Sequence, residues 1–198
     1  MTAIITTARL RLQPLSLDDL EPLLALWTEP GVRRFLFDDQ IISREQVTAE
    51  ILDSIERFET DGCGLWGATL CKETELIGFC GYRFFHDPPQ IQLLYGFHPD
   101  HWSKGLATEA ARTMIGFGFE RLGLECVVAS ADFPNTASLR VMAKAGMKFD
   151  RRETIDGLDT VYYKLDRQDY VPDNSLYKAL PGFEGDTIKH VHRGGSNE

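Results

Sequence analysis

Hydrophobic and polar positions alternate near the beginning of the chain. Leu10 and Leu12 would lie on one face of an extended segment, and Arg9 and Arg11 on the other. A repeat of two residues is typical of a β-strand with one buried face. Apolar runs bounded by turn-forming residues predict further strands. The expected strands cover residues 8–14, 65–71, 76–85, 90–97, 126–131 and 160–165.

Apolar side chains spaced three or four residues apart indicate the helices. The first helix follows Ser16 and is expected to end at Pro30, before a mixed aromatic and charged loop over residues 33–39. A second helix begins at Ser43, which forms a capping-box pattern with Gln46. The expected helices cover residues 16–29, 43–60, 107–122 and 135–145.

The order of these elements is α+β in character: a strand, two helices, three strands, then helix, strand, helix and strand. The three successive strands are expected to be antiparallel neighbours, because short connections join them. With 198 residues, 43% of them hydrophobic, the chain can build one full core but not two. We expect one domain over residues 1–170 and a tail over residues 171–198, in which Leu176 and Tyr177 could pack on the domain or on a partner.

The formal net charge of −9 argues against a nucleic-acid-binding surface and favours attraction for cationic amines or basic peptides. No apolar window reaches transmembrane length, and residues 1–12 lack the apolar stretch of a secretory signal. We therefore expect a cytoplasmic protein that binds neither nucleic acid nor membrane. The sequence carries no signal for oligomeric state.

The cysteines stand in or beside apolar runs and show no C-x-x-C spacing, which favours buried reduced thiols over disulfides or zinc ligands. They are Cys63, Cys71, Cys80 and Cys126. His190 and His192 form a His-x-His pair near the end of the chain, but no third ligand stands in a patterned context. No metal site is predicted.

Between the strand over residues 90–97 and the helix over residues 107–122, the sequence predicts a phosphate-binding turn. Gly105 permits a tight turn, and the first helical turn offers unpaired N–H groups and the positive end of the helix dipole to an anion. Lys104 adds a cation. A glycine and a lysine alone would also suit an ordinary strand-to-helix loop.

Two other phosphate motifs are excluded. A Walker loop requires Gly-Lys followed by Ser or Thr, whereas this chain has Ser103-Lys104-Gly105. The pair Gly116-x-Gly118 lacks the third glycine of a dinucleotide fingerprint and lies inside the expected helix rather than before it.

The turn belongs to a longer pattern, Trp102-x-x-Gly105-x-Ala107-x-Glu109-Ala110, and a second pattern follows it, Asn135-x-x-Ser138-x-x-x-Met142-x-Lys144-x-Gly146-Met147. In this order and spacing they resemble the coenzyme A pyrophosphate loop and the second motif of the GCN5-related N-acetyltransferases (GNAT), in the form typical of the RimJ/RimL-like branch. The wider resemblance covers about residues 8–170. It implies the GNAT acyl-CoA N-acyltransferase fold, α+β with a mixed, mostly antiparallel central sheet of splayed strands flanked by helices.

The resemblance implies acetyl-CoA as co-substrate, no metal, and direct attack by a primary amine of a protein N-terminus or a small molecule. Tyr95, Gly96 and Phe97 would hold the pantetheine arm on a strand that splays from its neighbour, and Gly96 would weaken regular pairing there. The pyrophosphate would lie on backbone amides of the turn. The residues expected around it are Trp102, Ser103, Lys104, Gly105, Leu106, Ala107 and Thr108.

Many members of the family carry a tyrosine general acid where this chain has Met142, and methionine has no proton to give. The RimL-like branch implies that Ser138 takes its place, as a hydrogen-bond donor to the departing thiolate. Asn135 opens the same helix and suits both a helix cap and a coenzyme contact. Ser138 is therefore the expected catalytic donor.

The general base is less clearly marked. Family members often have a glutamate at the position of Gln92, which carries no charge. Glu153 stands four residues before Gly157, as the water-positioning glutamate of RimL-like enzymes stands before its turn, although an exposed strand glutamate is the alternative. His98 and His101 flank the turn and suit either a proton shuttle or plain turn positions.

Two main classes of function therefore stay open, and a third, a structural interaction domain that binds no coenzyme, is the weakest because the turn is intact. The first is an acetyl-CoA-dependent N-acetyltransferase in which Ser138 and Glu153 take part in the chemistry. The second is a noncatalytic acyl-CoA-binding or sensing module on the same fold, which the missing tyrosine and the Glu-to-Gln departure would favour. The identity of the acceptor amine is open in either case.

Overall fold

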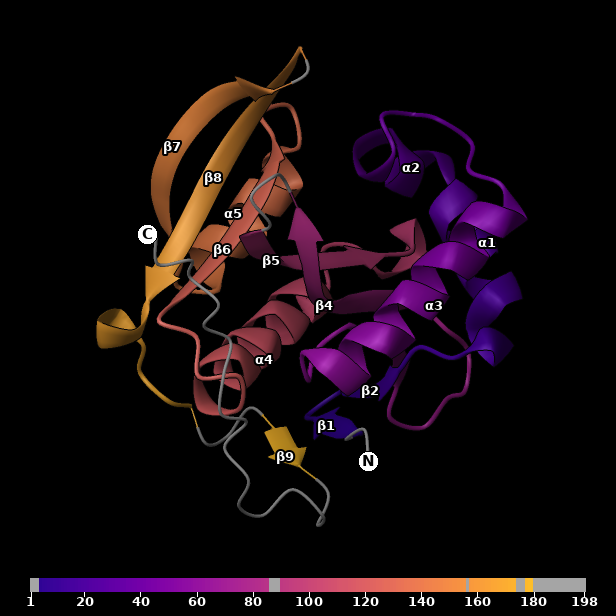
Figure 1. The fold of residues 1–198 in the computed structure, drawn as a ribbon, viewed down its shortest axis with the longest axis horizontal. Helices are drawn as coiled ribbons and strands as arrows, with labels where there is room; N and C mark the ends of the chain where they lie inside the picture. The colour runs from indigo at the N-terminus through magenta and orange to yellow at the C-terminus, as the bar shows by residue number, and fades with distance from the viewer. Residues whose placement is uncertain (1–3, 86–89, 156, 174–176, 180–198) are drawn as a thin grey trace, which may run out of the picture.

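The computed structural model of the protein describes residues 4–85, 90–155, 157–173 and 177–179. It contains two antiparallel sheets with helices packed around them (Figure 1). The helices are α1 (Leu20–Thr28), α2 (Pro30–Leu36), α3 (Arg44–Thr60), α4 (Leu106–Glu120) and α5 (Thr136–Lys144). The strands are β1 (Ile5–Thr7), β2 (Leu10–Pro14), β3 (Leu65–Leu70), β4 (Gly78–Phe85), β5 (Gln90–Phe97), β6 (Cys126–Asp132), β7 (Lys148–Ile155), β8 (Leu158–Asp166) and β9 (Tyr177–Ala179).

The main sheet has six strands in the order β5-β4-β3-β2-β1-β9. Its neighbouring strands are antiparallel, which confirms the pairing expected for β3, β4 and β5. Leu10 and Leu12 of β2 are fully buried, whereas Arg9 and Arg11 are exposed, as the alternation predicts. The α+β class is confirmed.

Hydrophobic cores cover both faces of the main sheet. Leu65 and Phe79 pack in a cluster with residues of α1, α2 and α3, while their neighbours Trp66 and Cys80 pack in a cluster with residues of α4. Successive side chains of a strand point to opposite faces, so α1 to α3 cover one face and α4 covers the other. Figure 1 shows α1, α2 and α3 gathered on one side of the molecule.

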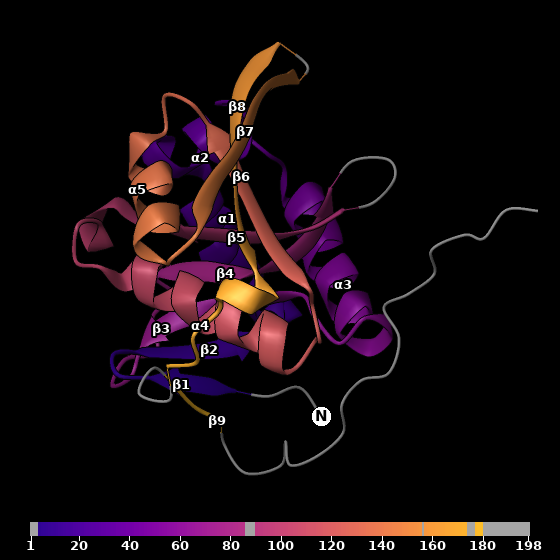
Figure 2. The same cartoon turned by 90° about the vertical axis from the view of Figure 1, so that its left-hand side faces the viewer.

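The second sheet has three strands in the order β6-β8-β7. Figure 2 shows that these strands cross the direction of β4 and β5 at a large angle. The strand before the turn, β5, and the strand after its helix, β6, therefore belong to different sheets. This is the separation that the sequence resemblance implied. A side-chain contact still connects them, because the Ser130 hydroxyl donates to the Gln92 side-chain oxygen over 2.9 Å.

The expectation of an irregular segment after Pro30 was wrong, and no sequence pattern predicted β7. Pro30 is the first residue of α2, within a segment expected to be irregular; proline suits the first helical turn, where its missing N–H would have had no partner. β7 carries five charged residues among eight and shows no apolar alternation. β7 is a strand because it pairs with β8, and the periodicity of the sequence gives no sign of that pairing.

The beginning of the chain also differs from expectation. The strand expected over residues 8–14 is β2 alone, and a further strand, β1, precedes a bend at residues 8 and 9. β1 pairs with β2 on one side and with β9 on the other. Tyr177–Ala179, from the expected tail, thus adds a strand to the edge of the main sheet.

The four cysteines are free. Cys63 and Cys80 are buried as expected, and burial raises the pKa of the Cys63 thiol to about 12. Burial was a wrong expectation for Cys71, which is exposed just after β3, and Cys126 is only partly buried. The His190 and His192 pair lies outside the described residues.

Among the residues that the structure describes, no group of three or more His, Cys, Asp and Glu side chains could hold a metal ion. Over the same ranges, no helix is both long enough and apolar enough to span a membrane.

Candidate functional site

Two residues of the turn between β5 and α4 adopt left-handed backbone conformations. A short 3-10 helix, Pro99–His101, leads into the turn, and Ser103 and Gly105 then have φ angles of 58° and 78°. Turns of this kind create a concavity lined by backbone N–H groups. Gly105 is also the N-cap of α4, where its lack of a Cβ makes the left-handed conformation inexpensive.

The amides of this turn are open. The first hydrogen bond into α4 runs from the Glu109 amide to the Gly105 carbonyl over 3.1 Å. Within the described part of the chain, the amides of Ser103, Lys104, Gly105, Leu106, Ala107 and Thr108 have no backbone or side-chain acceptor. A row of unpaired N–H groups at the positive end of a helix dipole suits a phosphate.

Trp102 connects the turn to its surroundings. Its amide donates to the Pro99 carbonyl over 3.0 Å, and its indole Nε1 donates to the Phe97 carbonyl over 2.6 Å. A Cβ on Gly31 of α2 would lie 2.8 Å from the Trp102 ring, so the ring lies directly against that helix. Trp102 is thus placed as a packing residue, and its amide is not one of the open donors.

Gly96 lets β4 and β5 approach closely. A Cβ at this position would lie 2.6 Å from the Phe79 ring, and the two residues are register partners. Gly96 pairs regularly with β4, so the weakened pairing expected at Gly96 concerns the other edge of its strand. The separation of strands occurs at the other edge of β5, which faces β6.

Tyr95 and Ser138, far apart in sequence, meet between β5 and α5. The Tyr95 hydroxyl lies 2.9 Å from the Ser138 hydroxyl and 3.1 Å from the Ser138 carbonyl oxygen. Burial raises the pKa of Tyr95 well above its usual value, so the phenol keeps its proton at neutral pH. Sequence reasoning named both residues but did not pair them, because no local pattern relates a strand position to a residue 43 positions later.

The beginning of α5 matches the predicted capping role. The Asn135 side-chain oxygen accepts a hydrogen bond from the Ser138 amide over 3.1 Å. Met142 is fully buried in the core one turn further along. The helix thus places the Ser138 hydroxyl beside the Tyr95 hydroxyl, while Met142 belongs to the buried core.

Two rows of side chains lie on one face of the second sheet. Ser130, Tyr162 and Arg151 are register partners across β6, β8 and β7, and the Arg151 guanidinium stacks 3.8 Å from the Tyr162 ring centroid. Because the Ser130 hydroxyl reaches Gln92 of β5, this face is directed toward β5. The next row on the same face consists of Asp132, Thr160 and Glu153.

Glu153 is an exposed residue of β7, and its carboxylate accepts a 2.6 Å hydrogen bond from Arg151. Sequence reasoning missed Asp132, at the end of β6. Burial, and then the charges of Asp38 and Asp159, raise the pKa of Asp132. The two carboxylates lie two strand spacings apart, about 10 Å between their backbones. Asp132 and Glu153 lie in one row because both pair with Thr160 of β8, and sequence patterns do not reveal that strand register.

Comparison with known proteins agrees with this geometry. The acetyltransferase (GNAT) domain family matches residues 9–148. The chain is 27% identical to the uncharacterized N-acetyltransferase p20 of Bacillus licheniformis, over 83% of this chain and 96% of that protein. It is 44% identical to the FsC-acetyl coenzyme A-N(2)-transacetylase of Aspergillus fumigatus, over 71% of this chain and 63% of that protein.

Solved structures share the fold. An acetyltransferase from Agrobacterium tumefaciens superposes with a TM-score of 0.73 at 20% identity, over 84% of this chain and 95% of the other. The ribosomal L7/L12 α-N-protein acetyltransferase RimL, solved with coenzyme A, superposes with a TM-score of 0.70 at 14% identity, over 83% of this chain and 97% of the other. With the family match and the open turn, these findings place the chain in the GNAT family as an acetyl-CoA-dependent acetyltransferase.

Proposed function

We propose that the protein transfers the acetyl group of acetyl-CoA to a primary amine, with the coenzyme pyrophosphate on the open amides of residues 103–108. The row of unpaired N–H groups at the N-terminus of α4 is the observation that carries this proposal. The side chains of Tyr95 and Ser138 lie beyond the turn, between β5 and α5, where the thioester end of the coenzyme would lie.

The reaction defines what the site must supply. A neutral amine nitrogen attacks the thioester carbonyl carbon, a C–N bond forms, and the C–S bond breaks. The nitrogen loses a proton and the sulfur gains one. The chain therefore needs a group that accepts a proton on the amine side and a donor for the thiolate.

Ser138 can donate to the thiolate only if its hydroxyl proton is not already bonded elsewhere. The direction of that proton depends on which Ser138 oxygen accepts the hydrogen bond from Tyr95. When Tyr95 donates to the Ser138 hydroxyl oxygen, the serine proton is free to point toward sulfur. When Tyr95 donates to the Ser138 carbonyl oxygen, the serine proton is directed at Tyr95 instead. We assign Ser138 the contact with the thiolate and Tyr95 the positioning of Ser138.

For the base, the proposal keeps Glu153 and adds Asp132 as a second candidate. Both carboxylates lie on the face of the second sheet that is directed toward β5. The Glu153 carboxylate already accepts a hydrogen bond from Arg151. We therefore propose that Glu153 accepts the amine proton through an intervening water molecule. Burial raises the pKa of Asp132, so its carboxylate holds a proton more strongly than an exposed aspartate does.

The acceptor amine is proposed from the relatives. The protein from Aspergillus fumigatus is named as a transacetylase acting at N(2) of FsC, and its 44% identity exceeds the 27% of the relative from Bacillus licheniformis. The structures of enzymes acting on protein N-termini, such as RimL, share the fold at only 14% identity. We therefore propose the N(2) amine of FsC, or of a molecule with the same acceptor group, as the substrate.

A panel of amines assayed by release of free thiol from acetyl-CoA tests the proposal. The panel contains FsC, a polyamine, an aminoglycoside and peptides with free N-termini. Turnover with FsC and none with the peptides would support the N(2) assignment, and the reverse result would contradict it. Coenzyme binding without thiol release for every amine would favour a noncatalytic acyl-CoA-binding module.

A further inference from the structure

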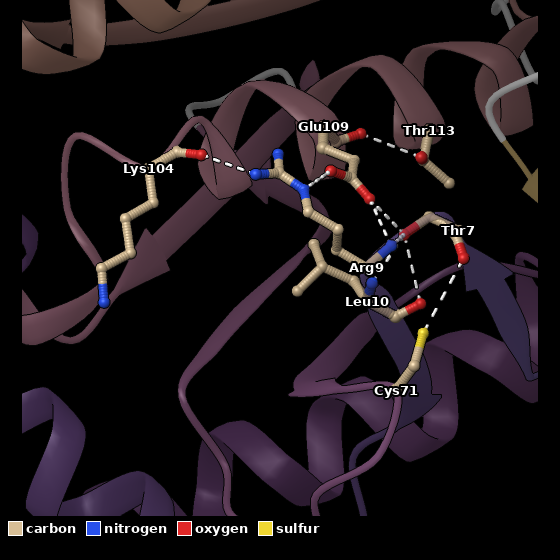
Figure 3. Close-up of polar contacts among 7 residues, drawn as sticks. All are labelled: Thr7, Arg9, Leu10, Cys71, Lys104, Glu109 and Thr113. Carbon is tan, nitrogen blue, oxygen red and sulfur yellow. Dashed lines mark hydrogen bonds and ion pairs between the residues drawn. The ribbon is translucent and has the colours of Figure 1, made fainter.

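A buried carboxylate lies just behind the coenzyme turn. Glu109, in the first two turns of α4, has a relative exposure of 9%. Its Oε1 atom accepts hydrogen bonds from the Thr7 hydroxyl over 2.6 Å and from the Arg9 amide over 3.0 Å, as Figure 3 shows. Its own backbone carbonyl accepts from the Thr113 hydroxyl over 2.9 Å. The first strands of the chain and the beginning of α4 are therefore joined through Glu109.

Arg9 connects this carboxylate to the turn itself. Its Nε atom binds Glu109 Oε2 over 2.6 Å, and its Nη1 atom donates to the Lys104 carbonyl over 2.7 Å. In Figure 3 the Lys104 carbonyl points toward Arg9, while the lysine ammonium extends away from it. One planar guanidinium thus holds a side chain of the helix and a carbonyl of the turn at the same time, a geometry that a lysine could not reproduce.

The bond to Lys104 sets the direction of the next amide. A trans peptide unit is planar, and its C=O and N–H groups point in opposite directions. With the Lys104 carbonyl held by Arg9, the Gly105 N–H is aimed away from Arg9. The left-handed φ of Gly105, 78°, is the backbone conformation that goes with this orientation of the turn.

The Arg9–Glu109 ion pair also neutralises a buried negative charge close to the proposed phosphate site. Burial by itself raises the pKa of Glu109, but hydrogen bonds from Thr7 and Arg9 outweigh burial, and the pKa lies below its usual value. Glu109 is therefore ionised at neutral pH. An uncompensated carboxylate in the first turns of α4 would repel a diphosphate bound at the helix N-terminus, and the guanidinium of Arg9 offsets that repulsion.

We propose that Arg9 is a positioning residue for the coenzyme: it orients the amides of the turn through the Lys104 carbonyl and neutralises Glu109 behind them. This inference rests on the proposed coenzyme site and adds to it a residue about 95 positions away in sequence. It predicts an effect confined to the pyrophosphate, because the thioester end of the coenzyme lies near Tyr95 and Ser138.

The test compares two acetyl donors. S-acetylpantetheine carries the same thioester as acetyl-CoA but no pyrophosphate. Arg9→Gln should raise KM for acetyl-CoA about tenfold, the size of one lost charge-assisted hydrogen bond, with kcat within twofold of wild type. With S-acetylpantetheine the same variant should keep the wild-type kcat/KM.

Matched variants separate positioning from folding. Arg11→Gln removes an exposed arginine two residues further along and should leave both donors unaffected. Arg9→Lys keeps the charge but cannot bind two acceptors in the same geometry, and should recover only part of the acetyl-CoA affinity. Should Arg9→Gln fold poorly, Arg9→Lys gives the same comparison between donors.

Equal losses with both donors would overturn the inference, since they would show a general structural effect. An Arg9→Gln variant that matches wild type with acetyl-CoA would also overturn it, while leaving the proposed function intact. Failure of the proposed function looks different, because the wild-type protein itself would then release no thiol in the amine panel.

Discussion

The proposed coenzyme site and the proposed acceptor face on the second sheet are built differently by the chain. The turn is a contiguous segment, residues 102–108, with an unbroken run of open amides from Ser103 to Thr108. The face of the second sheet that carries Asp132 and Glu153 is assembled from three strands, and only their register places the two carboxylates in one row. The proposed coenzyme site thus consists largely of local backbone, whereas the proposed acceptor site consists of side chains that tertiary structure brings together.

The largest expected effect lies in the turn. Gly105→Val should weaken acetyl-CoA binding by roughly a hundredfold or more, because a β-branched residue is strained at φ 78° and the turn that carries the open amides would have to change its conformation. Calorimetry on the folded variant measures this. Gly123→Val places comparable strain at φ 68° beyond the other end of α4, where a Cβ meets nothing within 4 Å, and should leave coenzyme affinity unchanged. Unchanged affinity in Gly105→Val would contradict the site.

Between the turn and the acceptor face, Ser138→Ala should act on chemistry and not on binding. Loss of one hydrogen bond to the developing thiolate costs about 2 to 4 kcal/mol, or roughly thirtyfold to a thousandfold in kcat. Acetyl-CoA affinity should stay within a few fold. Thr136→Ala, an exposed change in the same helical turn, is the control. A destabilised Ser138→Ala variant with normal single-turnover rates would remove Ser138 from the mechanism.

On the acceptor face, Glu153→Gln should lower kcat/KM by roughly tenfold to a hundredfold at neutral pH, since bulk water can partly replace a relay. The loss should shrink as pH rises, because more of the amine is then already neutral. The matched change is Asp132→Asn, assayed over the same pH range. If only Asp132→Asn lowers the rate, the base is Asp132 and Glu153 is an exposed strand residue paired with Arg151.

Tyr95→Phe should give the smallest effect of the four, a fall in kcat of about threefold to tenfold. The change removes one hydroxyl and leaves the ring, so Ser138 keeps its hydroxyl but loses the group that orients it. In Ser138→Ala the same tyrosine change should have no further effect, because the two residues act together. Independent, multiplying losses in the double variant would show that Tyr95 does not act through Ser138.

Sequence patterns found most elements whose burial follows a regular period. The alternation of Leu10 and Leu12 predicted β2, and the Ser43 and Gln46 capping box predicted the beginning of α3, where both of its hydrogen bonds are present. Patterns failed where the signal was absent or ambiguous. The charged β7 has no period to detect, and Pro30 suits the end of one helix as well as the beginning of another.

By itself, the sequence determined the family and indicated the proposed coenzyme turn and the candidate residues Ser138 and Glu153, because backbone conformation, helix caps and motif spacing depend on neighbours along the chain. Only the tertiary structure decided which of these residues act on one another. Tyr95 meets Ser138 across 43 positions, and Arg9 holds the Lys104 carbonyl across 95. Such contacts depend on strand register and on how helices pack against sheets, and these follow from the burial of the whole core rather than from any one segment.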